Sequence, residues 1–455
     1  MEWLPVEILG EICRQAEFRV LKPLRLVSRQ MAVLAAKELF NTVYFILLPD
    51  SIEKLRQIAN HPVIYRHVRS LRYIDDLLNP VFDDYDEWEE YARHVSTDSV
   101  SPWHIAKYHR FVYLQNLQSE LIRSGFESEL FEKILSHFPQ LESFHILDKA
   151  YFDVHYDKMP IIEKLESETL LPRNYLLTPR DSDQSETLTH DPFIRAFSTS
   201  PNKVRHLVFG GVDSQIWGDF EVPAVYTSIR PFVVSTFHQL LSLDLCLGMD
   251  GMENSSDDDS MSRFTDFLSM APNLECLALR LYAAEQHDIT DVFTRLTWVN
   301  LKRLVLWNCT GEVESFAGFV GRHAPKLRIL ELKTVKLVES DSPSAPLSSQ
   351  SLADSKKSQE VGSLWEQASL RIAPALNLDM VTLKNLLDAK QTARRLQGNI
   401  DPFSYDFLTT AWNLELCLYL KTCKRGAYFP IYGQPRVLFQ TIPEDGKPAF
   451  VSARR

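Results

Sequence analysis

The sequence predicts an α/β fold in which a small helical unit precedes an irregular solenoid of parallel strands and helices. Three observations lead to this prediction. The phrase L-x-x-L-x-L recurs along most of the 455 residues, helix-like stretches separate its copies, and the first 45 residues carry apolar stripes at helical spacing. Because one strand-plus-helix unit cannot bury its apolar side alone, the copies are expected to stack into a continuous core.

The clearest copy of the phrase is LKRLVLWNC, from Leu301 to Cys309. Leu304 and Leu306 alternate and therefore point to one face of a short strand. Leu301 enters from the preceding turn, and Cys309 is expected to turn inward after the strand. This is the strand phrase of leucine-rich repeats, so the body of the chain is expected to be leucine-rich-repeat-like.

Weaker copies surround this one at irregular spacing, and a wide gap separates Leu71 from Phe144. Helical patterns between copies run from Asp288 to Thr297 and from Phe316 to His323. An alternative is a general α/β domain whose leucine-rich strands imitate the phrase. The weaker copies begin at Val68, Leu141, Val204, Leu240, Leu274 and Leu327, and Leu414–Leu418 is a candidate for a last strand.

The first 45 residues predict two or three short helices. Leu4, Ile8 and Ile12 recur at steps of four, which is one stripe of a helix. Pro5 fits the first turn of that helix, and Pro23 marks the expected start of a second one. So small a unit is marginal alone and must dock on the rest of the chain or on a partner. Its further apolar positions are Leu9, Leu21, Leu24, Val27, Met31, Leu34, Ala35, Leu39 and Phe40, followed by the β-rich run Thr42–Phe45.

This segment resembles the F-box family, in the form found in fungal-type F-box proteins. LPVEILGEI, from Leu4 to Ile12, is similar to the F-box opening L-P-x-E-I-L-x-x-I. Leu24–Arg29 resembles the second block, and Leu34–Phe40 resembles the ending. Met31 stands where the family often has an aromatic residue, and the stretch between the helices lacks the usual Asp-rich turn. The residues alone also allow a plain cap on the body.

The resemblance implies a substrate-receptor subunit of an SCF-type (Skp–cullin–F-box) ubiquitin ligase. The N-terminal segment would bind a Skp-type adaptor and, through it, a cullin–RING ligase, while the repeat body would hold a target protein that the sequence does not identify. Glu7 would help orient the first helix, since acidic groups are favoured near helix N-termini. The adaptor-binding residues implied are Leu4, Pro5, Glu7, Ile8, Leu9, Ile12, Leu24, Leu26 and Val27. A non-ligase scaffold that uses the same segments is the alternative.

Charge and composition exclude several classes of partner. The net charge of −11 argues against general binding to nucleic acid or anionic membranes. No run of about 18 apolar residues predicts a transmembrane helix, and the acidic start does not fit a signal peptide. The six cysteines are scattered and are expected to be reduced thiols of an intracellular protein, cytoplasmic or nuclear.

The sequence carries none of the motifs that we associate with catalysis. It has no glycine-rich phosphate loop, no G-x-S-x-G and no H-E-x-x-H. We therefore expect no enzymatic activity, no cofactor and no metal. One enzymatic alternative is kept: on a strand, Asp153, His155 and Asp157 would share a face and form an acid–base or metal cluster.

Composition also divides the chain into expected segments. We expect a helical F-box-like domain at 1–45, a repeat body at 46–338, a disordered loop at 339–360, and the end of the repeats with an irregular tail at 361–455. The acidic stretch 75–90 is expected to be a solvated insertion pinned by Phe82, Tyr85 and Trp88. Asn254–Ser262 is expected to be a polar loop, and Met380–Leu396 a helix.

Overall fold

The computed structural model describes residues 4–79, 82, 84–93, 102–147, 160–171, 176–178, 196, 203–212, 223–248, 258–282, 287–339, 364–372, 375–376, 378–384 and 387–388. These form two compact units, Met1–Glu285 with Arg295–Arg303 and Gln286–Thr294 with Leu304–Arg455. The predicted strand at 414–418, the cluster at 153–157, the tail beyond 388 and nearly all of the loop at 339–360 lie outside the described residues. The domain boundaries expected from the sequence stay predictions.

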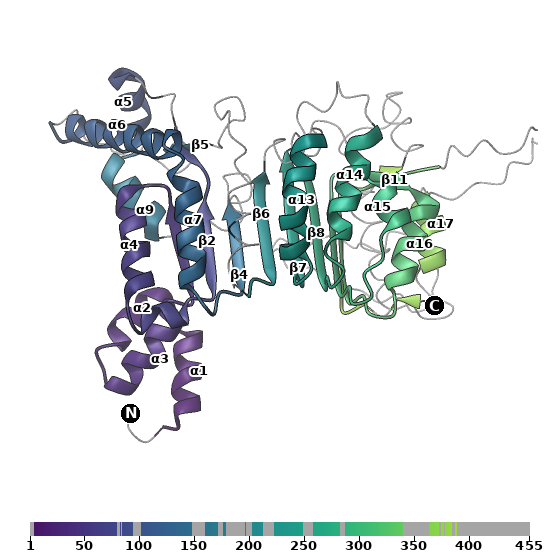
Figure 1. Ribbon diagram of the computed structural model, residues 1–455, viewed down its shortest axis with the longest axis horizontal. Coiled ribbons are helices and arrows are strands. Elements are labelled where there is room, and N and C mark those ends of the chain that lie inside the picture. Colours follow the sequence, from purple (N-terminus) through teal and green to yellow (C-terminus); the bar gives the residue numbers. More distant parts are fainter. Residues whose placement is uncertain are drawn as a thin grey trace, which may run out of the picture. The chain divides into compact units, whose positions relative to one another are not determined.

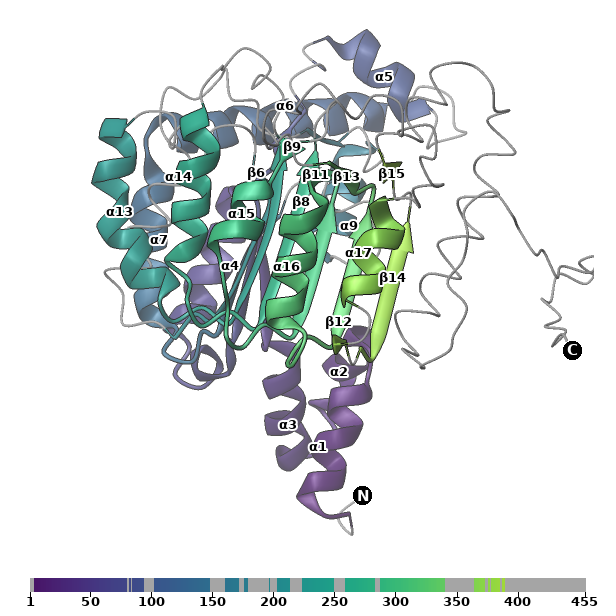
Figure 2. The same cartoon turned by 90° about the vertical axis from the view of Figure 1, so that its right-hand side faces the viewer.

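Three short helices open the first unit: α1 (Val6–Gln15), α2 (Phe18–Leu24) and α3 (Arg29–Leu39). Helix α3 packs against both α1 and α2 (Figure 2). Their shared core is entirely apolar, so burial holds the helices together at the expected positions. The core residues are Leu9, Cys13, Leu21, Met31, Ala35 and Leu39.

The expected start of a helix at Pro23 is wrong. Pro23 lies inside α2, near its end, and α3 begins only at Arg29. The local reason is Ser28, whose Oγ accepts a hydrogen bond from the Met31 N–H at 3.1 Å. Serine in this extended N-cap conformation satisfies one free N–H of the new helix, so the cap fixes the boundary.

Parallel strands follow in the first unit, in the order β1-β2-β4-β6-β7-β8. Their register aligns Val43, Leu71, Phe144, Leu207, Leu243 and Leu277 in one buried row. This row is the second leucine position of the L-x-x-L-x-L phrase, so the predicted strand phrase is confirmed here. The strands are β1 (Thr42–Ile46), β2 (Ser70–Ile74), β4 (Ser143–Leu147), β6 (His206–Val212), β7 (Ser242–Gly248) and β8 (Cys276–Tyr282).

Helices α4 (Pro49–Asn60), α7 (Phe126–His137), α13 (Pro223–Phe237) and α14 (Asp258–Ser269) lie along one face of these strands (Figure 1). Phe131 of α7 packs on Phe45 and Tyr73, with ring centroids 6.1 and 5.4 Å apart. The polar loop expected at Asn254–Ser262 is wrong from residue 258 onward, because acidic residues are favoured in the first turn of a helix and α14 begins there.

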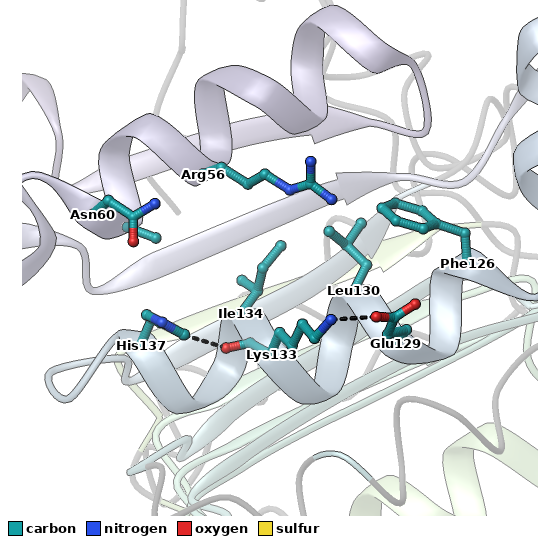
Figure 3. Close-up of a pocket in the computed structure, with 9 residues that line it drawn as sticks. Arg56, Asn60, Phe126, Glu129, Leu130, Lys133, Ile134 and His137 are labelled. Carbon is teal, nitrogen blue, oxygen red and sulfur yellow. Dashed lines mark hydrogen bonds and ion pairs between the residues drawn. The ribbon is translucent and has the colours of Figure 1, made fainter.

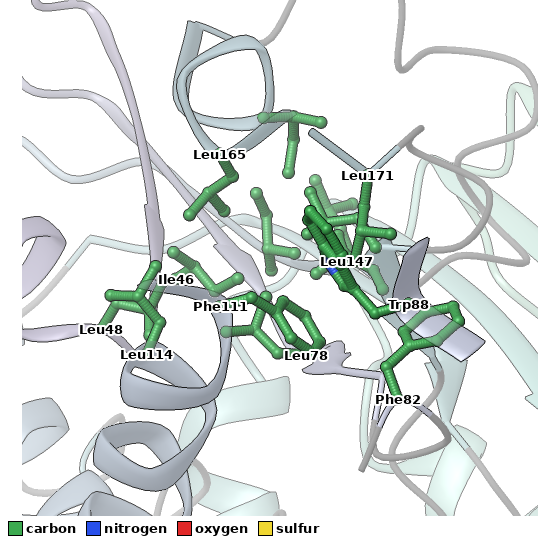
Figure 4. Close-up of a cluster of buried hydrophobic side chains, with 14 of the residues drawn as sticks. Ile46, Leu48, Leu78, Phe82, Trp88, Phe111, Leu114, Leu147, Leu165 and Leu171 are labelled. Atoms are coloured by element: carbon green, nitrogen blue, oxygen red, sulfur yellow. The ribbon is translucent and has the colours of Figure 1, made fainter. Parts of the chain in front are cut away.

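An insertion covers the opposite face of the first strands. It contains α5 (Tyr85–Arg93), α6 (Pro102–Arg123), α9 (Pro160–Thr169) and the antiparallel pair β3 (Leu77–Leu78) and β5 (Leu177–Thr178). Ile46, Ile74 and Leu147 share a row of the sheet and one core cluster with Phe111 and Leu165 (Figure 4). Phe82 and Trp88 belong to that cluster too, so they anchor the acidic stretch as expected.

The second unit repeats the strand-plus-helix pattern. Strand β12 (Ile329–Lys333) pairs in parallel with β14 (Met380–Lys384). A second parallel ladder follows the order β15-β13-β11-β9, namely Leu387–Asp388, Lys336–Val338, Cys309–Glu312 and His287–Asp288. The repeat strand β10 (Arg303–Trp307) and helices α15 (Thr290–Arg295) and α16 (Val313–His323) are confirmed, and α17 (Leu364–Ile372) was not predicted.

The helix expected from Met380 is wrong over its described part. Leu378, Val381 and Leu383 follow the same L-x-x-L-x-L phrase, with valine in the second position. Their segment forms β14, and β15 follows at Leu387–Asp388. The steps from Met380 to Leu383 and Leu387 imitate a helical period, and periodicity cannot separate the two in so short a run.

Candidate partner-binding surface and adjoining groove

Helix α1 has two apolar faces, and the molecule covers only one of them. Leu9 and Cys13 are 2% and 0% exposed in the core of α1–α3. Ile8 and Ile12 are 49% and 44% exposed on the other face, in line with Leu4 just before the helix, which is 42% exposed. Side chains four residues apart lie above one another on a helix, so Ile8 and Ile12 form an open apolar ridge, and Leu4 is exposed just before it.

The turn between α2 and α3 adds a second exposed apolar site. Leu26 is 88% exposed and Val27 is 53% exposed. The Leu26 N–H donates to the carbonyl of Pro23 at 2.9 Å, and the Val27 N–H donates to that of Leu24 at 3.2 Å. These bonds fix the backbone of the turn, so little backbone entropy would be lost if the two side chains bound a partner.

Exposed apolar side chains are concentrated in this part of the molecule. Within the described ranges, fourteen large hydrophobic residues are exposed, and eight of them precede residue 34. Contiguous exposed apolar patches mark interaction surfaces, whereas single exposed apolar residues need no explanation, so this part of the molecule is the candidate partner-binding surface. We call this set the N-terminal apolar residues: Leu4, Val6, Ile8, Ile12, Val20, Leu26, Val27 and Val33.

The residues predicted for adaptor binding do not all lie on this surface. Leu9 is buried in the core of α1–α3, so it could touch a partner only if the helices separated, and its role in adaptor binding stays a prediction. Leu24 is half-buried against the same core. The prediction missed Val6, Val20 and Val33, which fall outside the matched motif positions. The remaining predicted residues, Leu4, Pro5, Glu7, Ile8, Ile12, Leu26 and Val27, are exposed.

A groove of about 820 Å³ adjoins these helices. Its walls come from the C-terminal end of α1, from α2, from the end of α3, from β1, and from α4 and α9. Ile58 and Ile161 contribute apolar surface, and Leu55 lies buried behind the α4 wall. Its charged residues are Arg14, Lys22, Arg25, Lys54 and Lys164 against Glu38, so cations predominate in a chain of net charge −11.

Some of these cations are already paired. Lys164 contacts Asp50 and Glu168, each at 3.1 Å, and hydrogen bonding to these carboxylates raises its pKa. Arg14 contacts Glu11 at 2.5 Å. Arg25 lies over the ring of Phe40, 5.7 Å from its centroid. A ring does not neutralise the charge, and within the described ranges Arg25 forms no ion pair.

A smaller hollow of about 190 Å³ lies between α4 and α7 (Figure 3). Lys133 pairs there with Glu129, which lowers the pKa of the Glu129 carboxyl. Arg56 lies over the ring of Phe126 at 5.5 Å. Since its charged groups have partners within the hollow and are exposed, we assign it no site.

Comparison with known proteins does not identify a family for this chain. No protein-family model and no curated protein matches the chain. The leucine-rich repeat-containing protein LegL7 from Legionella pneumophila is a similar solved structure, at 13% sequence identity and a TM-score of 0.24, covering 80% of this chain and 99% of that one. The leucine-rich-repeat-like character of the body rests on the strand phrase and its register.

The described residues form no constellation that we recognise as catalytic. Among them, no group of His, Cys, Asp and Glu is placed to hold a metal ion. The Cys13 thiol beside the groove has a raised pKa because it is buried, which suppresses the reactive thiolate. No described helix is long and apolar enough to cross a membrane. The exposed apolar side chains and the charged groove are therefore the features that a function has to use.

Proposed function

We propose that this chain is an F-box substrate receptor of an SCF-type ubiquitin ligase. Its N-terminal helices would bind a Skp-type adaptor, and its repeat body would bind a target protein. The observation that supports this proposal is the concentration of exposed apolar side chains on α1–α3. It falls in the same residues that resemble the F-box opening and its second block.

The physical basis of adaptor binding would be burial of a few aliphatic anchors. Fully burying one such side chain contributes about 1.5–3 kcal/mol, and a few central anchors dominate most interfaces. Leu26 and Ile8 are the strongest candidates, since they are 88% and 49% exposed on backbone that is already fixed. Leu9 would act indirectly by holding α1 against α3.

Ubiquitin transfer would take place on other subunits, so this chain needs no catalytic group. Its contribution would be to raise the effective concentration of the target near the ligase and to orient it. Stacked repeats present a long surface that suits protein recognition.

The test is a pull-down of the full chain from its native cell extract, with bound proteins identified by mass spectrometry. The variant Ile8→Asp/Leu26→Asp places charges in the proposed apolar interface, where they would be unpaired. The matched control Val63→Asp/Val299→Asp makes the same change at residues that are 52% and 73% exposed elsewhere. We expect the unmodified chain and the control, but not the test variant, to retain a Skp-type adaptor and a cullin.

Each other outcome has a definite meaning. If the Ile8→Asp/Leu26→Asp variant retained as much adaptor as the unmodified chain, the assignment of these residues to the interface would be wrong. Adaptor without cullin, and no ubiquitination of a co-purified protein, would favour the non-ligase scaffold. If the unmodified chain retained neither protein, we would infer that the N-terminal helices are only a cap on the body.

A further inference from the structure

The groove beside the helices runs along an open sheet edge. Strand β1 is the outermost strand of the sheet in the first unit, and no described strand pairs with its other side. The Asn41 carbonyl accepts from the Ser70 N–H at 2.9 Å, so it points toward β2. The Ile46 N–H instead donates to Ser51 Oγ at 3.1 Å, away from β2.

This alternation fixes the direction of the backbone groups between them. In a strand, N–H and C=O of every second residue point to the same side. Thr42 and Tyr44 therefore share the outward direction of Ile46. At Ile46 the start of α4 closes the edge, because its carbonyl also accepts from the Leu48 N–H at 2.7 Å. Thr42 and Tyr44 line the groove itself.

Two helices form the walls beside this edge. Helix α4 contributes Lys54, Leu55 and Ile58 to the groove, and α9 contributes Ile161 and Lys164. A chain laid along β1 would send alternate side chains toward the two walls. Addition of an extended peptide to an open sheet edge is an established mode of recognition, in which backbone hydrogen bonds give affinity and flanking pockets give specificity.

Charge selects the occupant. Five of the six charged residues that line the groove are Lys or Arg, although the whole chain is strongly acidic. Lys164 and Arg14 have acidic partners, whereas no ion pair within 4 Å joins Lys54 or Arg25 to an acidic side chain of the described residues; the charge of Lys54 acts on Asp50 at longer range. Exposed cations attract an acidic ligand and select against a basic one.

We propose that this groove binds an extended acidic segment of a partner protein, paired with the outer edge of β1. The two outward residues allow pairing with about three to four residues of peptide, or ~10–13 Å at ~3.3 Å per residue. Acidic side chains would contact Arg25 and Lys54, and the alternate aliphatic ones would pack on Ile161 of the α9 wall. The proposal does not depend on adaptor binding, since it uses the edge of β1 and not the open face of α1.

The test uses the full chain and a fluorescein-labelled hexapeptide of alternating glutamate and valine, followed by fluorescence anisotropy. We expect saturable binding that weakens by about tenfold or more in Arg25→Glu/Lys54→Glu, a change of ~1.4 kcal/mol per tenfold. The control Arg56→Glu reverses one charge on the same helix, at a residue that does not line the groove, and should bind within about twofold of the unmodified chain.

A second probe tests the backbone pairing without altering the protein. N-methylation of alternate residues of the hexapeptide removes the hydrogen-bond donors on one edge while keeping its charge. We expect about a tenfold loss when the methylated edge is the one that faces β1. A hexapeptide with lysine in place of glutamate should show no saturable binding.

Several results would overturn the proposal. If both N-methylated peptides bound with equal affinity, pairing with the edge of β1 would be ruled out. If Arg25→Glu/Lys54→Glu bound the peptide as tightly as the unmodified chain, recognition by these two cations would be ruled out. If the unmodified chain did not bind the glutamate peptide at millimolar concentration, the proposed binding site would be wrong. A dimer in sedimentation that dissociates in the double variant would assign the groove to a second copy of this chain.

Discussion

Ile8 and Leu9 are neighbours in α1 with opposite environments. Ile8 is 49% exposed, and Leu9 is 2% exposed among Cys13, Leu21 and Met31. Leu9→Ala is expected to destabilise the packing of α1–α3 by about 2–5 kcal/mol, because it leaves a cavity. Ile8→Ala is expected to change it by no more than ~0.5 kcal/mol. Hydrogen exchange of the α1–α3 amides in the full chain measures both.

Similar losses of protection in the two variants would contradict the assignment of faces. Capture of the adaptor adds an independent readout. On the proposed function, Ile8→Ala weakens capture while protection stays intact, and Leu9→Ala weakens both together. This pairing separates a contact residue from one that only supports the contact.

The sequence could identify the apolar residues of α1 but not which of them the fold covers. Leu4, Ile8 and Ile12 share one stripe, and Leu9 and Cys13 share another. Both stripes have helical spacing, so periodicity predicts the helix without deciding between its two faces. That decision depends on where α3 packs, which is a long-range property. The groove escaped prediction for the same reason, since its cations come from separate elements.

At the scale of elements, Gly311 shows how tightly a short strand packs. A Cβ on Gly311 of β11 would lie 2.5 Å from Cε2 of Phe293, a ring that is fully buried. Gly311→Ala is therefore expected to cost about 1–3 kcal/mol of unfolding free energy, because the ring must shift within a packed core. Urea denaturation, followed by hydrogen exchange of β11 and α16, measures the loss.

Gly321 supplies the matched control for that substitution. It lies in α16, and a Cβ there would meet nothing within 4 Å. Gly321→Ala is expected to stabilise the unit by about 0.5–1 kcal/mol, because alanine loses less backbone freedom in a helix than glycine. Stabilisation by both substitutions would show that Phe293 yields easily and that the close approach has no energetic role.

The repeat phrase predicted strands well and their connections poorly. Leucine positions located β2, β4, β6, β7, β8, β10 and β12 because alternation and burial coincide there. The ladder of β9, β11, β13 and β15 was missed, since its strands are two to four residues long and partly polar. Asn308 and Thr334 precede β11 and β13 with φ of 55° and 54°. These left-handed residues set the turn into the second ladder, and threonine gives no sequence signal for it.

At the scale of the whole molecule, the insertion changes which faces of the repeats are open to a binding partner. In the first strands, α6 and α9 cover the sheet face opposite α4 and α7, so that face has become core. Helix α6 runs for 22 residues and was not predicted. On the proposed function, a target would therefore bind elsewhere on the body. Burial of this face also places titratable groups inside the sheet, which links the structure to pH.

His145 of β4 is the group through which acid is expected to weaken the whole fold. Burial, together with the positive charges of Arg72 and His206 on the adjacent strands, lowers its pKa from 6.5 to about 3. Its Nε2 lies 2.6 Å from Ser143 Oγ. Because the pKa of His145 is lower in the folded state than in the unfolded state, only the unfolded state binds this proton at pH values between the two. The contribution of His145 to the free energy of unfolding is therefore fully present above about pH 6.5 and is lost as the pH falls toward 3.

The slope from this residue is at most ~1.4 kcal/mol per pH unit, and the window from about pH 6.5 to pH 5 lies above the range where most carboxylates titrate. Urea denaturation at closely spaced pH values should show a steeper loss for the unmodified chain than for His145→Gln, whose amide carries no titratable proton. His67 and His323 also have lowered pKa values through burial, so the variant should keep part of the slope. Identical slopes would mean that His145 has the same pKa in the folded and the unfolded protein, which would contradict the lowered pKa.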